Sequence, residues 1–67
     1  MKTNNLLFLG IEKEEIEIIE KINLEINTIS DIKNLYNQLS SNNIKNVIIV
    51  PIITNHNVCY LIQRVIL

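Results

Sequence analysis

The residues with the clearest chemical potential are His56 and Cys59, which lie three positions apart. On a helix this spacing places two side chains on one face. A thiol at the start of a helix is an activated nucleophile, and a neighbouring histidine can serve as its base. No acid lies nearby in the sequence to orient the histidine, as a catalytic triad requires. A thiol-dependent or small-ligand-binding site at Asn55, His56 and Cys59 is therefore the alternative hypothesis rather than the main one.

Other chemistries find less support in the sequence. A single cysteine and a single histidine do not form the ligand cluster of a zinc site. The Glu-rich stretch of residues 12–20 lacks the Asp, Asn and Gly spacing of a calcium loop. Gly10 stands alone, whereas dinucleotide-binding motifs use several glycines at fixed spacing. We expect no enzyme activity, no metal and no cofactor.

Composition points to a small folded protein. The chain has 67 residues, 48% of them hydrophobic and 19% charged, with a formal net charge of −1. This charge gives no reason to expect a nucleic-acid partner. The longest apolar run, residues 47–53, is far shorter than the ~20 residues that span a bilayer, and residues 6–9 are too short for a secretory signal. We expect a cytoplasmic protein without membrane insertion.

Charge is distributed unevenly along the chain. From Ser41 onward only Lys45 and Arg64 carry a full charge, and every acidic residue lies before that point. The apolar, acid-free second half is typical of an interface or a core.

Hydrophobic periodicity predicts the regular elements. Short apolar or alternating runs indicate strands at residues 5–9, 24–29 and 47–50. Apolar residues at helical spacing indicate one helix within residues 11–22 and a second around residues 32–39.

The last segment allows two interpretations. Its apolar residues at helical spacing predict a helix, which we favour: Val58, Leu61, Ile62, Val65 and Ile66. Alternatively, residues 55–57 form the turn of a hairpin between two strands, because Val, Ile, Cys and Tyr are good strand formers.

These elements predict a single α/β domain over residues 1–67 with the order β-α-β-α-β-α. Right-handed crossovers make the strands parallel, in the order 2-1-3, with helices on both faces of the sheet. The alternative is an α+β fold with a C-terminal β-hairpin. Because both edges of so small a sheet are open, we expect the third strand to pair with its own copy across a two-fold axis.

This pattern resembles the first half of a response-regulator receiver domain. The resemblance rests on residues 6–10 followed by an acidic helix, then on residues 25–29 and 47–50. It covers nearly the whole chain and about half of the family's domain. Gly10 and Ile11 stand where receivers carry paired acids, and Pro51 stands where they carry the phosphoacceptor aspartate. The resemblance therefore implies a flavodoxin-like topology and no phosphotransfer.

The sequence predicts a non-catalytic protein–protein interaction module, either an accessory subunit or a small regulator or inhibitor. It would act through its apolar C-terminal half, on a copy of itself in a homodimer or higher oligomer, or on a larger protein. The residues predicted to contact the partner are Val47, Ile49, Pro51, Ile53, Tyr60 and Arg64.

Overall fold

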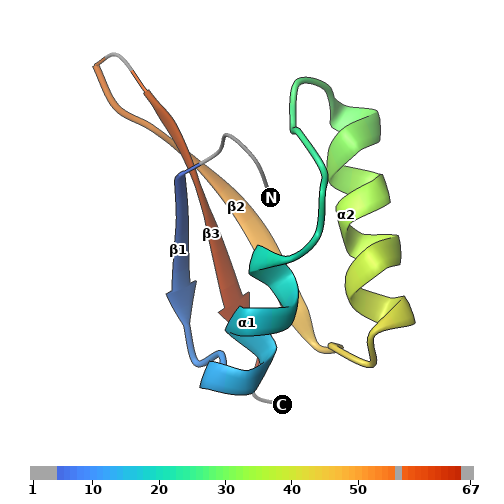
Figure 1. Cartoon of the computed structure of the whole chain (residues 1–67). Coiled ribbons are helices and arrows are strands. Elements are labelled where there is room, and N and C mark those ends of the chain that lie inside the picture. The colour runs from blue at the N-terminus through green and yellow to red at the C-terminus, as the bar shows by residue number, and fades with distance from the viewer. Residues whose placement is uncertain (1–4, 56, 66–67) are drawn as a thin grey trace.

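The computed structural model describes residues 5–55 and 57–65. Its elements are, in chain order, β1 (Asn5–Leu9), α1 (Lys13–Glu20), α2 (Ile29–Ser41), β2 (Val47–Ile53) and β3 (Val58–Arg64). They form two layers, with the strands in one sheet and both helices against the same side of it (Figure 1).

The sheet is mixed, and its last strand lies in the middle. The strand order is β1-β3-β2. β1 runs parallel to β3, from the pair Asn5 and Cys59 to the pair Leu9 and Gln63. β2 runs antiparallel to β3 and forms a hairpin with it. The expected parallel sheet of order 2-1-3 with helices on both faces is therefore wrong, and the alternative α+β fold with a C-terminal hairpin fits.

Residues 58–64 form a strand rather than the favoured helix because they pair along both edges, with β1 and with β2. The turn before them is closed at Thr54, whose backbone N–H and hydroxyl both donate to the carbonyl oxygen of Asn57, at 2.9 and 3.0 Å. The adjacent polar residues Gln63 and Arg64 do not interrupt the strand, since successive side chains point to opposite faces.

The strand expected at residues 24–29 is also absent from the described chain. The segment is an extended connection between α1 and α2, and α2 already begins at Ile29. Thr28 caps this helix: its hydroxyl accepts from the N–H of Asp31 at 3.3 Å, and the Asp31 carboxylate accepts from the N–H of Thr28 at 2.9 Å. The alternation of apolar and polar residues in this segment reflects burial rather than strand pairing, because Ile26 is buried while Glu25 is exposed.

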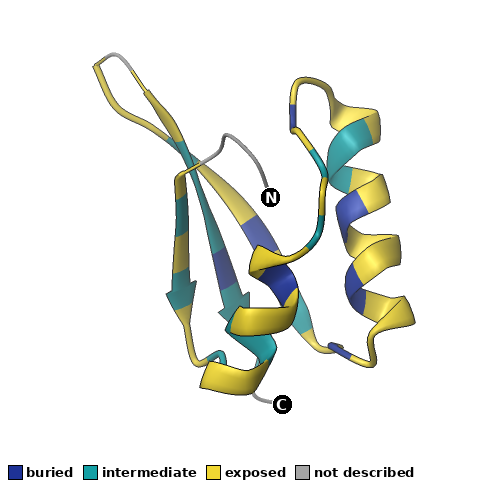
Figure 2. Ribbon diagram, in the orientation of Figure 1, coloured by how far each residue is buried: buried dark blue, intermediate teal, exposed yellow. Residues whose placement is uncertain are grey.

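The core lies between the helices and the sheet (Figure 2). Both helices contribute to it from a single face, in keeping with their apolar spacing. The buried residues are Ile19, Ile26, Leu35, Leu39, Ile44, Ile49 and Ile62.

Candidate functional site

The sheet has a second face, turned away from the helices, and its residues follow from the pairing of the strands. We call them the open face. They lie in three rows across β1, β3 and β2: Leu7, Leu61 and Val50 in the centre, with Asn5, Cys59 and Ile52 on one side and Leu9, Gln63 and Ile48 on the other. None of these residues belongs to the core between helices and sheet.

The open face is apolar and uncharged. Seven of its nine side chains are hydrophobic by type, and the two others are amides. Leu7 is 48% exposed, Leu9 54% and Ile48 41%. A sheet with one solvated face normally alternates apolar and polar residues, whereas strands covered on both faces are apolar throughout. The residues of β2 follow the second pattern, yet the described chain covers one face only.

The free edge of β2 is partly closed. The backbone N–H of Ile49 points away from β3 and donates to the Tyr36 hydroxyl of α2, at 2.7 Å. Every second residue of an antiparallel strand donates outward, so Pro51 belongs to the same outward set and has no N–H to offer. Two successive outward positions therefore offer no donor to another strand.

The predicted interface residues lie on the side of the sheet that carries the helices, because they alternate with the residues of the open face. Ile49 is buried, and Val47 and Tyr60 pack against the core. Pro51 is exposed, and Ile53 is 79% exposed near the hairpin turn. Their part in binding a partner stays a prediction.

Arg64 has a structural environment of its own. Its guanidinium donates to the carboxylate of Glu15 in α1 and, at 2.9 Å, to the carbonyl oxygen of Lys45. The same Glu15 oxygen accepts from the backbone N–H of Glu12 at 3.1 Å, which closes a capping box at the start of α1. The Arg64 hydrogen bond, together with the Glu12 N–H, holds the pKa of Glu15 below its usual range. Arg64 thus joins the end of β3 to α1.

The residues of the alternative site do not share a helix face. Cys59 lies in β3 on the open face, half-buried between Asn5 and Ile52, and Asn55 is exposed in the hairpin turn. His56 lies outside the described residues. Within residues 5–55 and 57–65, no group of three His, Cys, Asp or Glu side chains is placed to hold a metal ion.

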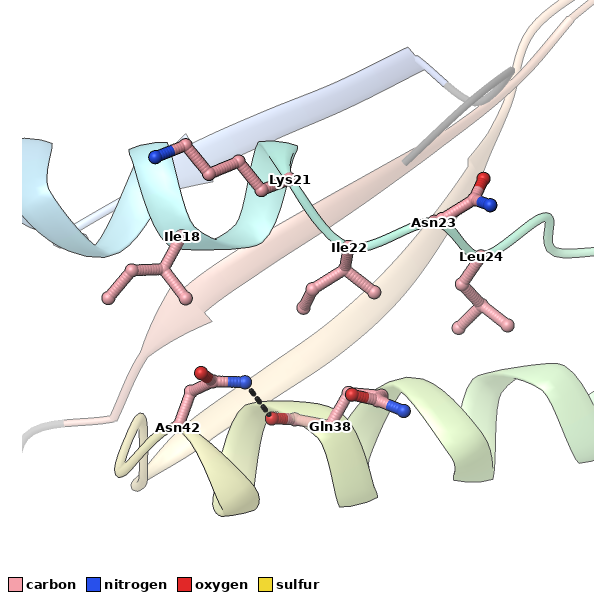
Figure 3. Close-up of a pocket in the computed structure, with 7 residues that line it drawn as sticks. All are labelled: Ile18, Lys21, Ile22, Asn23, Leu24, Gln38 and Asn42. Atoms are coloured by element: carbon pink, nitrogen blue, oxygen red, sulfur yellow. Dashed lines mark hydrogen bonds between the residues drawn. The ribbon is translucent and has the colours of Figure 1, made fainter.

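A groove of about 570 Å³ lies between the end of α1, the connection after it, and α2. In Figure 3 Ile22 and Leu24 point toward α2, where Asn42 donates to the carbonyl oxygen of Gln38 at 2.8 Å. Ile18, Lys21 and Asn23 complete its lining. Sequence reasoning missed this groove, because it depends on how the connection crosses α2 and no local pattern marks it.

Comparison with protein families, curated proteins and solved structures finds no match to this chain. The receiver resemblance accordingly stays a prediction, although the parallel topology that it implied is wrong. Neither described helix has the length and apolar character needed to cross a membrane. Function must be argued from the open face and the groove.

Proposed function

We propose that the chain is a non-catalytic protein-binding module and that its binding surface is the open face. The main support for this proposal is that the sheet is apolar on both faces while the helices cover only one of them. The largest contiguous apolar patch on the surface of a protein is often a functional surface. This proposal keeps the function expected from the sequence, an accessory subunit or small regulator of the cytoplasm, and assigns it to a different set of side chains.

The chemistry of the open face suits a protein partner better than a substrate. Its only nucleophile is Cys59, and no described acid or second titratable side chain lies in the same rows. An apolar surface without charge gains its affinity from burial of hydrophobic area rather than from directed polar contacts. Cys59 is then a small apolar contact within the surface rather than a reactive group.

Photo-crosslinking tests this proposal directly. A benzophenone amino acid replaces Val50 on the open face, and as a matched control it replaces Glu17 on the exposed side of α1. We expect position 50 to give a discrete protein adduct after irradiation in the cells that naturally produce the chain, with no discrete adduct from position 17. Absence of an adduct from position 50, or equal adducts from both positions, would refute the open face as the binding surface.

A second candidate function is small-ligand binding, and the groove between α1 and α2 is the observation that favours it. Its volume of about 570 Å³ lies within the ~300–1,000 Å³ range of small-molecule sites. A screen with apolar fragments bearing a carboxylate or an amide, followed by amide NMR, tests it. Saturable shifts confined to Ile22, Leu24 and Gln38 would support this function, and shifts confined to the open face would exclude it.

A further inference from the structure

We infer that the partner of the open face is a second copy of this chain, so that two sheets pack face to face across a two-fold axis. This inference rests on the proposed function and adds the identity of the partner. It differs from the side-by-side pairing of strand edges expected from the sequence, because the sheets stack instead of extending one another.

The absence of charge on the open face argues for a second copy. Charges complementary to a different protein would steer its encounter with this surface and fix its register. The open face has none. Two copies therefore meet without like-charge repulsion, whereas contact through α1 would bring its acidic residues Glu14, Glu17 and Glu20 against the same acids of the other copy.

The edge of β2 argues against the competing mode of self-association. Tyr36 already occupies the outward N–H of Ile49, and Pro51 has no N–H. A second β2 placed alongside would lose hydrogen bonds at these two positions in both copies. The open face needs no backbone hydrogen bonds, because packed sheets join through their side chains.

The size and shape of the open face fit a modest dimer. Five paired positions on three strands cover a plane of roughly 14 by 17 Å, given ~4.8 Å between strands and ~3.3 Å per residue. The accessible area of such a patch falls in the ~300–600 Å² range of the largest apolar patch on a typical protein. Two copies then bury about 600–1,200 Å², at or below the lower limit of stable complexes. We expect a weak dimer, with a dissociation constant in the micromolar to millimolar range, because so small an area leaves little surplus over the cost of association.

Leu61 lies at the centre of the middle row, between Leu7 and Val50. A two-fold axis that runs through this centre, along or across the strands, places Val50 opposite either Val50 or Leu7 of the other copy. Val50 is therefore inside the contact in both orientations and is the position to substitute.

The experiment measures solution mass by light scattering behind a sizing column, from about 1 μM to about 1 mM, on the full chain. The open-face variants are Val50→Lys and, separately, Ile48→Lys. The matched control is Ile53→Lys, which changes a more exposed isoleucine of the same strand that lies outside the open face. Circular dichroism shows whether each variant is folded, and only folded variants are compared.

We expect the average mass of the unmodified chain to rise with concentration from 7.8 kDa toward twice that value. Either open-face lysine should raise the dissociation constant at least ~100-fold, because the contact then buries an unpaired charge from each copy, and Ile53→Lys should leave it within about threefold. A dimer that survives both open-face variants, or one lost only in Ile53→Lys, overturns the inference.

The unmodified chain also serves to separate the two proposals. A monomer at every concentration overturns the second copy as partner. In that case an adduct between position 50 and a different protein in the crosslinking experiment still supports the proposed function. A monomer that also gives no adduct overturns both.

Discussion

The hydrogen bond between the Tyr36 hydroxyl and the Ile49 N–H gives the most specific prediction. Replacing Tyr36 with phenylalanine keeps the ring and removes the acceptor, so the outward N–H of Ile49 loses its partner. A buried N–H left unpaired costs about 1–3 kcal/mol. Because Tyr36 is 36% exposed, water reaches this site in part, and we expect the lower half of the range, about 1–1.5 kcal/mol. For a domain of this size the melting temperature should fall by roughly 5–10 °C.

Thermal unfolding followed by circular dichroism measures this loss, and amide hydrogen exchange locates it. The Ile49 amide should exchange about tenfold faster in the variant, since a tenfold change corresponds to ~1.4 kcal/mol. The matched control is Tyr60→Phe, which removes the hydroxyl of a half-buried tyrosine for which the described residues provide no hydrogen bond. The control should change the free energy of unfolding by less than ~0.5 kcal/mol.

Two results would contradict the reasoning. One is a Tyr36→Phe variant as stable as the unmodified chain, with unchanged exchange at Ile49. The other is an equal loss of stability in Tyr60→Phe, which would show that the tyrosine hydroxyls act through general solvation rather than through a closed strand edge.

Three further predictions concern stability, each measured by urea unfolding. Gly10→Ala should cost about 1–2 kcal/mol, because Gly10 has φ +71° and an added Cβ would lie 3.1 Å from the Cβ of Arg64; an unchanged midpoint would contradict this. Leu39→Ala should cost about 2–5 kcal/mol, because Leu39 is fully buried, and a cost below ~1 kcal/mol would show that the core is not packed around it. Stability should fall as the pH drops below about 4.5, because the Arg64 hydrogen bond depresses the pKa of Glu15 and the Asn27 and Thr28 N–H groups depress that of Asp31. Both carboxylates therefore stabilise the fold above the pKa of the unfolded chain, and that contribution is lost as the pH falls through the folded pKa; Glu15→Gln should flatten the curve.

Local patterns were sufficient to predict several elements. The apolar runs at residues 5–9 and 47–50 lie in β1 and β2, and helical spacing located α1 and α2. In these elements the spacing of apolar residues that are close in sequence matches the face that each element buries, so local periodicity is enough to predict them. Residues 24–29 show the limit of the same reasoning, because alternation reports which side chains are buried and does not report whether the backbone finds a partner strand.

The helix favoured for the last segment is wrong for a different reason. Val58, Leu61 and Ile62 fit a helical stripe, and the same residues fit a strand that is apolar on both faces. Pairing decides between helix and strand, because residues 58–64 form backbone hydrogen bonds with β1 along one edge and with β2 along the other. This choice also decides the candidate site: as part of a strand, Cys59 and Leu61 join the open face, whereas on a helix they would point in different directions.

The sequence did signal that β2 is apolar on both sides, and the interpretation of that signal was only half correct. From this signal the sequence predicts helices on both faces of the sheet, and the structure has them on one. The chain forms two helices in the described residues, and both pack on one face, so these helices leave the other face uncovered.

The central position of β3 has a consequence for how the protein is made. Each residue pair between β1 and β3 joins opposite ends of the described chain. Examples are Asn5 with Cys59 and Leu9 with Gln63. Since chains are synthesised from the N-terminus at about 5–20 residues per second, β1, α1 and α2 emerge before the strand that unites the sheet exists. Bringing together residues so far apart in the sequence costs conformational entropy before any contact between the strands forms, and this cost slows folding. During that interval β1 and β2 are separate apolar strands, so we expect the sheet to assemble only after β3 has emerged.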